Sequence, residues 1–372
     1  MEKGDGKMII GMQEGAKRDG VRDQRIAKVV ELVPPQRLLE ELPLAAERAQ
    51  AVVRGRQEVV DVLQGRDPRL MVVVGPCSVH DPVAALDYAR RLSAKSEELH
   101  EDLLVVMRVY FEKPRTTTGW KGLINDPHLD GSNDVNTGLR MARKLLLEVV
   151  DLGLPVGCEF LDPITPQYIS DAVAWGAIGA RTAESQTHRQ LGSGLSMPIG
   201  FKNRTDGNVQ VAVDAVRAAA APHAFAGIDD AGTPAILHTT GNPDCHIILR
   251  GGHGTPNYGP AEVGDALVTL GVANLPERVV IDASHDNSGK DPARQFEAAG
   301  EIADQLAGGQ EAIVGVMLES FLVEGRQDLN APEDLTYGQS VTDACIDWDH
   351  TVAVLDRFAG AVRARRAKAG DA

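Results

Sequence analysis

The chain has 372 residues and a formal net charge of −15, from 38 Lys and Arg against 53 Asp and Glu. This charge repels nucleic acid and anionic membrane surfaces, and aromatic residues at 4% offer few platforms for stacked bases, so both kinds of partner are excluded. Hydrophobic residues at 43% are enough for a substantial core, and the length allows either one large α/β barrel or two domains.

The N-terminal region carries no targeting or membrane signal. It lacks the apolar stretch of a signal peptide, and no run in the chain approaches the ~20 apolar residues of a membrane span. Residues 1–22 are rich in Gly, Lys and Asp and are predicted to be a mobile tail. Residues 23–64 follow as an N-terminal extension, in which apolar residues at helical spacing up to Leu63 predict one helix.

The four cysteines bear on the cellular compartment. Cys77, Cys158, Cys245 and Cys345 are far apart and form no CxxC pair, which argues against a zinc ribbon or a disulfide scaffold. A reducing cytoplasm is the expected location.

From residue 65 onward, short apolar runs alternate with amphipathic segments, which is typical of repeated strand-helix units and a parallel sheet. Eight runs of this kind are present: Leu70–Val74, Leu103–Val109, Pro155–Phe160, Ala177–Ala180, Met197–Phe201, Cys245–Leu249, Arg278–Ile281 and Ala312–Leu318. Helix starts are predicted at Asp81-Pro82 and Thr165-Pro166, where a capping side chain precedes a proline. Residues 65–372 are therefore predicted to form a (β/α)8 TIM barrel of the α/β class.

The stretch 224–238 interrupts this rhythm. Its apolar residues are mixed with Gly, Asp and Pro, so we interpret it as a small inserted excursion before the sixth strand, in the form of a hairpin.

In a barrel of this kind the active-site residues follow the C-terminal ends of the strands. The positions after the eight predicted strands hold Cys77, Arg108, Lys113, Arg115, Glu159, Arg181, Glu184, Lys202, Arg250, His285 and Glu319. Six of these are cations, which would repel one another unless anions bind among them, so phosphate and carboxylate groups are the expected ligands. A single Arg or Lys is usually a solvated surface residue, but recurrence after successive strands favours a site.

A metal site is a second interpretation of the same strand ends. Cys77, His285 and Glu319, with Asp343 nearer the C-terminus, offer a thiolate, an imidazole and two carboxylates. Such mixed ligands suit Mn²⁺, Fe²⁺, Co²⁺ or Zn²⁺ better than Mg²⁺ or Ca²⁺. A buried apolar cysteine and a hydrogen-bonded core histidine are the alternative, and the shared strand-end position leaves the two interpretations level.

Several of these residues stand in longer motifs. They are Gly75-Pro76-Cys77-Ser78-Val79-His80-Asp81, Lys113-Pro114-Arg115-Thr116, Gly179-Ala180-Arg181-Thr182, Gly200-Phe201-Lys202-Asn203, His246-Ile247-Ile248-Leu249-Arg250-Gly251-Gly252 and Asp282-Ala283-Ser284-His285. In this order the motifs resemble those of type I 3-deoxy-D-arabino-heptulosonate-7-phosphate (DAHP) synthases, and the resemblance extends from about Ile26 to Arg365.

The resemblance implies a metal-dependent transferase that condenses phosphoenolpyruvate with erythrose 4-phosphate and releases phosphate, at the entry to the shikimate pathway of aromatic amino acid biosynthesis. It places the metal on Cys77, His285, Glu319 and Asp343. It places the substrates on Arg108, Lys113, Pro114, Arg115, Thr116, Glu159, Ala180, Arg181, Lys202 and Arg250. It also implies a homodimer or homotetramer and makes an aromatic amino acid a plausible feedback inhibitor.

Lys113 is the predicted general acid of this reaction. It stands between the positions assigned to the two substrates, and a desolvated lysine flanked by cations is expected to have a lowered pKa. The catalytic set predicted from the resemblance is Lys113, His285 and Cys77.

Some positions depart from the family pattern. Arg204 and Asp286 stand where small residues are expected, Ala183 replaces a threonine, and residues 226–235 lack a lysine-bearing sequence. None of these departures removes a predicted catalytic group.

Two other functions were weighed. A sibling synthase that uses arabinose 5-phosphate is opposed by residues 113–116, where that enzyme carries a different polar sequence. A catalytically silent, ligand-binding barrel is opposed by the complete set of predicted metal ligands and substrate cations.

Overall fold

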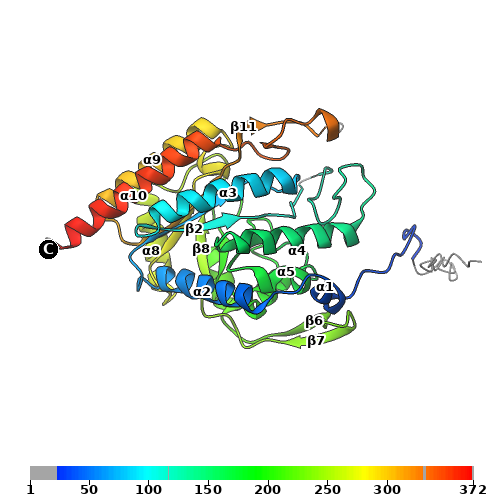
Figure 1. Cartoon of the computed structure of the whole chain (residues 1–372). Helices are drawn as coiled ribbons and strands as arrows, with labels where there is room; N and C mark the ends of the chain where they lie inside the picture. Colours follow the sequence, from blue (N-terminus) through cyan, green and yellow to red (C-terminus); the bar gives the residue numbers. More distant parts are fainter. Residues whose placement is uncertain (1–22, 116, 330–331, 371–372) are drawn as a thin grey trace, which may run out of the picture.

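The computed structural model describes residues 23–115, 117–329 and 332–370, and at its centre is a closed barrel of parallel strands (Figure 1). The strands are β1 (Leu70–Gly75), β2 (Leu103–Arg108), β3 (Val156–Glu159), β4 (Trp175–Ile178), β5 (Ile199–Lys202), β8 (His246–Leu249), β9 (Val279–Asp282) and β10 (Ile313–Glu319). Around the barrel their order is β1-β10-β9-β8-β5-β4-β3-β2. The predicted (β/α)8 barrel is confirmed, and each predicted strand overlaps an observed one.

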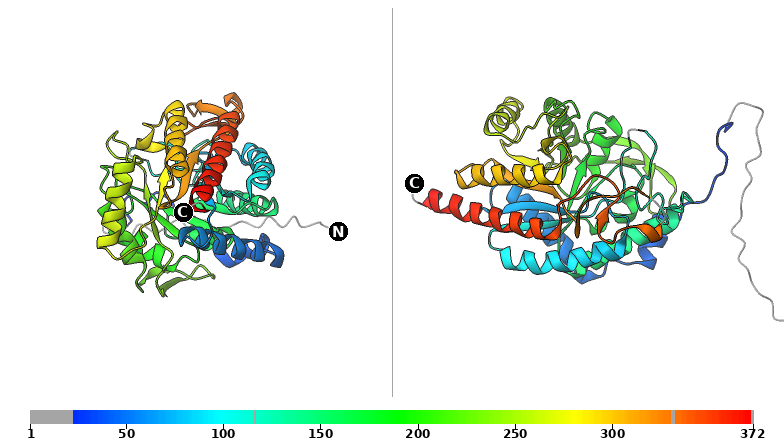
Figure 2. Two further views of the ribbon diagram at one scale, coloured as in Figure 1. Left: turned by 90° about the vertical axis from the view of Figure 1, so that its left-hand side faces the viewer. Right: turned by 90° about the horizontal axis from the view of Figure 1, so that it is seen from above.

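Helices surround the barrel (Figure 1). They are α1 (Pro35–Glu41), α2 (Ala46–Leu63), α3 (Pro82–Leu99), α4 (Val135–Asp151), α5 (Pro166–Ile169), α6 (Gln186–Gly194), α7 (Gln210–Ala219), α8 (Pro260–Val272), α9 (Pro292–Ala307) and α10 (Trp348–Gly370), with 3₁₀ turns at Ser170–Ala172, His285–Asn287 and Pro332–Asp334. The C-terminal helix α10 lies along α9 (Figure 2). No helix in the described ranges is both long and apolar enough to cross a membrane.

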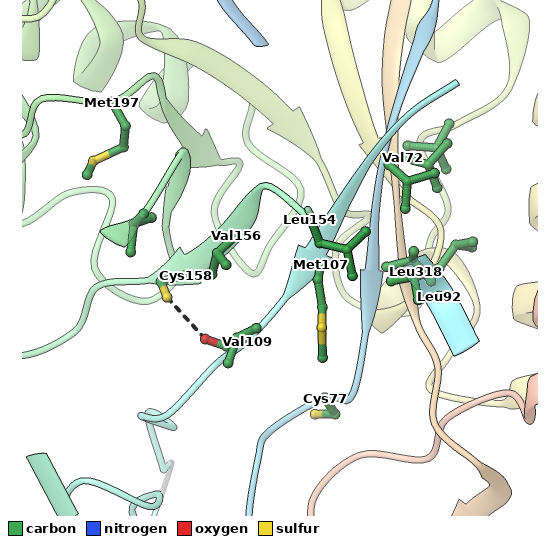
Figure 3. Packing of buried hydrophobic residues seen from close by; sticks show 14 of the residues in the cluster. Val72, Cys77, Leu92, Met107, Val109, Leu154, Val156, Cys158, Met197 and Leu318 are labelled. Atoms are coloured by element: carbon green, nitrogen blue, oxygen red, sulfur yellow. Dashed lines mark hydrogen bonds between the residues drawn. The ribbon is translucent and has the colours of Figure 1, made fainter. Parts of the chain in front are cut away.

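The strands are buried on both faces, which is why they read as continuous apolar runs. Leu70, Val72 and Val74 belong to the cluster that includes the surrounding helices, and Figure 3 shows Val72 in this cluster. Met71 and Val73 belong instead to a second cluster, which fills the barrel interior.

Helix α2 closes the N-terminal end of the barrel. Its residues Val59, Val62 and Leu63 belong to the interior cluster, together with Trp175 of β4 and Met317 of β10. The opposite, C-terminal end is therefore the one left for a site.

The N-terminal extension contains two helices in its described part, where the sequence predicted one. Pro35 begins α1, and Pro43 separates α1 from α2, because a proline lacks the N–H that a continuous helix would need. The predicted mobile tail, residues 1–22, lies outside the described residues.

One of the two predicted helix starts has the expected cap. The Asp81 carboxylate accepts hydrogen bonds from the backbone N–H groups of Val83 and Ala84, at 2.8 and 3.2 Å. Thr165 does precede α5, but its side chain makes no cap; its hydroxyl donates instead to the buried carboxyl of Glu112 at 3.0 Å. The Thr165 side chain thus binds a residue distant in sequence, Glu112, and not the backbone N–H groups of α5.

The predicted excursion is an antiparallel hairpin of β6 (Ala224–Ile228) and β7 (Pro234–His238), which precedes β8 (Figure 1). The N–H of Gln36 in α1 donates to the carbonyl of Asp230 in its turn, at 2.7 Å, so the hairpin packs on the N-terminal extension. A second small pair joins β11 (Val323–Arg326) and β12 (Gln339–Ser340) near the C-terminal end of the barrel strands.

Candidate active site

A cavity of about 260 Å³ opens at the C-terminal ends of the barrel strands. Its walls are formed by Lys113, Pro114, Arg115, Thr117, Thr118, Glu159, Gly179, Ala180, Arg181, Lys202, Thr205, Arg250, His285, Lys290 and Asp343. Ten of the residues predicted from the sequence are among them. Thr116 lies outside the described residues.

Three of the four predicted metal ligands converge beside this cavity: Asp343 lines it, whereas Cys77 and Glu319 are buried and do not. The ligand atoms of Cys77, Glu319 and Asp343 all lie within 4.8 Å of one another. His285 lies beside them, with Nε2 3.7 Å from Glu319 Oε1. Ligand atoms about 2.0 to 2.3 Å from one ion are at most about 4.6 Å apart, so this donor set fits a single divalent metal after small side-chain movements.

Burial and charges of both signs act on the predicted ligands. Burial and the neighbouring Glu319 raise the pKa of the Cys77 thiol. Burial alone would raise the pKa of Asp343, but Lys113 and Lys290 lie close to it and lower it. A bound divalent cation would oppose the rise at Cys77, since thiolate ligands lose their proton to a metal.

Figure 3 shows Cys77 just beyond the end of β1, near Met107 of β2. In the same view the thiol of Cys158, on β3, donates to the carbonyl of Val109 at 3.1 Å, so this cysteine is held away from the metal set.

Lys113 reaches into the metal set. Its Nζ lies 3.0 Å from Cys77 Sγ and 3.3 Å from the Cys77 carbonyl. The prediction of a lowered pKa is wrong: burial acts in that direction, but Cys77 and Glu319 outweigh it and raise the pKa of Lys113. Desolvation and flanking cations were expected to dominate, and the interactions with Cys77 and Glu319 dominate instead.

The loop after β2 is folded back so that Lys113 is held in place. The N–H of Lys113 donates to the carbonyl of Lys121 at 2.8 Å. Gly122 adjoins this bond with φ +121°, and a Cβ there would overlap the carbonyl of Phe111. Only glycine allows this close approach.

Arg108 lies beneath the cavity and is not one of the residues that line it. Its Nε donates to the Pro76 carbonyl at 3.1 Å and its Nη2 to Glu319 Oε1 at 2.8 Å. The guanidinium carbon stands 3.7 Å from the ring centre of Tyr110. Its Nη1 is buried and has no hydrogen-bond partner among the described residues.

The other predicted cations form one wall of the cavity. Arg181, Lys202 and Arg250 follow β4, β5 and β8, which are neighbours in the barrel, and the Arg181 guanidinium donates to the Pro114 carbonyl at 3.4 Å. Cys77, Glu319 and His285 come from β1, β10 and β9, which are also neighbours. The cavity thus has a cationic wall and, on a different arc of the barrel, a predicted metal-ligating wall, in which His285 and Asp343 line the cavity and Cys77 and Glu319 are buried beside them.

Asp282 joins the two walls, and the sequence analysis did not select it. This buried carboxylate lies 3.1 Å from Lys202 Nζ and 2.9 Å from His285 Nδ1, so it contacts a predicted substrate cation and a predicted metal ligand together. Burial acts to raise the pKa of Asp282, but the neighbouring His285 and Lys202 side chains lower it. The spacing of Asp282 and His285, three residues apart after a strand, was the available signal.

Lys290 and Tyr110 were also missed. Lys290 Nζ lies 3.0 Å from Asp343 Oδ1, and Tyr110 stacks on Arg108. Nothing local in the sequence marks either residue.

The chain is similar to known proteins over most of its length. The chain is 56% identical over 344 residues to the "Phospho-2-dehydro-3-deoxyheptonate aldolase, Phe-sensitive" of Escherichia coli strain K12, which covers 92% of this chain and 98% of that protein. It is 57% identical over 354 residues to the phospho-2-dehydro-3-deoxyheptonate aldolase of Corynebacterium glutamicum, with 93% and 96% covered.

A solved structure gives the same result for the fold. The phospho-2-dehydro-3-deoxyheptonate aldolase of Francisella tularensis SCHU S4 matches with a TM-score of 0.89 at 50% identity, over 91% of this chain and 99% of that one. The model of the DAHP synthetase I family matches residues 43–356. On this agreement of fold and sequence, the chain belongs to the DAHP synthetase I family.

Proposed function

We propose that the cavity at the C-terminal ends of the strands is where this chain, a DAHP synthase by its family, condenses phosphoenolpyruvate with erythrose 4-phosphate and water. The products are DAHP and phosphate, in the first step of aromatic biosynthesis. The observation that carries the proposal is the meeting of a cationic wall and a metal-ligating wall in one cavity.

The cationic wall suits phosphoenolpyruvate. Arg181, Lys202 and Arg250 come from neighbouring strands, and together they match a phosphate dianion and a carboxylate. Held in this way, the substrate presents its C3 carbon to the second substrate in a near-attack arrangement. Glu159 lies 3.9 Å from Lys202 Nζ and helps to orient that cation.

Arg108 supports this wall from below. Its contacts to Glu319 and to the Pro76 carbonyl fix the guanidinium, and its unpartnered Nη1 remains as a buried donor for a substrate anion. A buried donor without a partner is costly, so a ligand that accepts from it is expected.

The sugar phosphate is assigned to the loop after β2. Pro114 and Arg115 line the cavity on this side, and Thr116 completes the assignment from the sequence. This loop lies beside Lys113, so the aldehyde carbon of erythrose 4-phosphate would reach the metal-ligating wall.

A divalent metal held by Cys77, His285, Glu319 and Asp343 would supply Lewis-acid polarisation of the aldehyde oxygen. Lys113, the proposed general acid, would then protonate that oxygen as it becomes an alkoxide. Its raised pKa keeps the ammonium charged, so that it enters the reaction as a donor. Water adds at C2, and phosphate leaves into the cationic wall.

One assay tests this proposal. We expect phosphoenolpyruvate to be consumed with erythrose 4-phosphate but not with arabinose 5-phosphate, and turnover to stop after treatment with a chelator and to return when Mn²⁺, Fe²⁺, Co²⁺ or Zn²⁺ is added. Equal rates with the two sugars, or turnover that persists after chelation, would refute it. Comparison of the four metals also identifies the preferred ion.

We also infer that an aromatic amino acid inhibits this enzyme, because the Escherichia coli relative is named Phe-sensitive. Addition of Phe, Tyr and Trp separately to the same assay tests this inference, and full activity with all three would contradict it. A homodimer or homotetramer is inferred from the family and is measurable by light scattering.

A further inference from the structure

Arg250 carries a carboxylate partner that none of the assignments above uses. Its Nη1 contacts Oδ2 of Asp286, the residue that follows His285 in the 3₁₀ turn after β9. The Arg250 side chain is 7% exposed and that of Asp286 is 24% exposed. The pair therefore sits at the rim of the cavity, with the arginine facing inward and the acid nearer to solvent.

The two edges of the Arg250 guanidinium are used differently. Nη1 is the nitrogen that contacts Asp286, whereas Nε is buried and has no hydrogen-bond partner among the described residues. The backbone of Arg250 is fixed separately, since its N–H donates to Asn203 Oδ1 at 2.7 Å. Asp286 thus occupies one corner of the guanidinium and leaves the Nε edge for another acceptor.

Asp286 differs in this respect from Asp282, the acid that faces Lys202. Asp282 is fully buried and is bound on several sides, by Lys202, by His285 and by the N–H of Ser284 at 3.0 Å. Asp286 is partly exposed, so its carboxylate regains hydration when it moves away from Arg250. It is a partner that an incoming anion can displace.

We propose that Asp286 is an internal competitor for Arg250: its carboxylate neutralises the arginine in the free enzyme, weakens the binding of phosphate groups there, and retakes the arginine when product phosphate leaves. The proposal rests on the assignment of Arg250 to the phosphoenolpyruvate subsite. Its physical basis is charge, since Asp286 both shares the positive charge of Arg250 and repels any anion that approaches it. Asp286 is accordingly an affinity-determining residue that acts through Arg250.

The test is the Asp286→Asn variant, which keeps the shape of the side chain and removes its charge. Inorganic phosphate is titrated into the metal-loaded enzyme by calorimetry, and the KM for phosphoenolpyruvate is measured with erythrose 4-phosphate in excess. We expect the Kd for phosphate and the KM for phosphoenolpyruvate both to fall by about two- to fivefold, the upper part of the range measured for exposed charge pairs. The turnover number should change less than KM, or should fall because phosphate leaves more slowly.

Two further variants make the result specific. Asp304→Asn removes one negative charge from the exposed pair of Asp304 and Arg357, neither of which lines the cavity, so its Kd for phosphate should stay within about twofold of wild type. Asp286→Glu keeps the charge and should remain closer to wild type than Asp286→Asn. Metal content is measured for each variant, because Asp286 is adjacent to His285.

An unchanged or weaker affinity for phosphate in Asp286→Asn would overturn the proposal, and so would an equal gain in Asp304→Asn. Failure of the wild-type enzyme to condense the two substrates would refute the proposed function instead. The phosphate titration requires no turnover, so the two failures are distinguishable.

Discussion

The buried carboxyl of Glu112 allows a sharp prediction about stability. Glu112 stands between β2 and Lys113 and is only 2% exposed. Burial, with a smaller contribution from Asp162, raises its pKa from 4.5 to about 7, against the hydrogen bond that it accepts from Thr165. Such a shift corresponds to about 3 kcal/mol of lost stability once the group is ionised in the folded protein.

The sign of the pH dependence follows from the direction of the shift. A carboxyl with a raised pKa holds its proton in the folded state between pH 4.5 and about 7, whereas the unfolded chain has released it. Its favourable contribution is complete below pH 4.5 and is lost as the pH rises through about 7. Glu112→Gln removes this titration and retains an acceptor for the Thr165 hydroxyl.

We therefore compare the free energy of unfolding of Glu112→Gln with that of wild type at each pH. This difference should shift in favour of the variant by up to about 3 kcal/mol between pH 5 and pH 8. Urea unfolding at several values between pH 5 and pH 8 measures the difference. Glu41→Gln is the matched control: the exposed Glu41 carboxylate has its pKa lowered by the hydrogen bond from Arg140, so it titrates below this window. Parallel stability profiles for wild type and Glu112→Gln would refute the reasoning.

Three more variants test the site and its support. Lys113→Met should lower turnover by about 10² to 10⁴-fold while the metal still binds, as expected for loss of a general acid, and normal turnover would exclude that role. Asp282→Asn should weaken metal binding by about 10- to 100-fold in a titration of the apoenzyme, because His285 loses its orienting partner; unchanged affinity would argue against such positioning. Arg143→Met should cost about 2 kcal/mol in urea unfolding, since the buried guanidinium donates to the carbonyls of Leu42 and Tyr168, which would lose this partner; an unchanged free energy of unfolding would contradict this.

Much of the fold can be predicted from the sequence because it depends on the local pattern of apolar, Gly, Asp and Pro residues. The eight apolar runs marked the strands, since a strand buried on both faces needs continuous apolar side chains. The Gly, Asp and Pro residues of 224–238 marked the hairpin. The break between α1 and α2 was missed although Pro43 signals it, because the apolar spacing continues across that proline.

Properties that depend on neighbours distant in sequence could not be predicted from local sequence patterns. The pKa of Lys113 is raised by Cys77 and Glu319, which come from other strands and reach it only in the folded barrel. Thr165 was predicted to cap a helix, but its hydroxyl donates a hydrogen bond to the Glu112 carboxyl instead. Asp282 stood in a quoted motif, but its contact with Lys202 emerges only when β5 and β9 are placed around the same barrel.

The division of the cavity into two arcs has an evolutionary consequence. The predicted metal ligands Cys77, His285 and Glu319 lie at the ends of β1, β9 and β10, whereas the predicted substrate cations Arg181, Lys202 and Arg250 lie at the ends of β4, β5 and β8. Loops on one arc can be exchanged or lengthened without altering the hydrogen-bonded strands of the other. New substrates are therefore most readily acquired through the loops after β2, β4, β5 and β8, with the metal chemistry inherited unchanged.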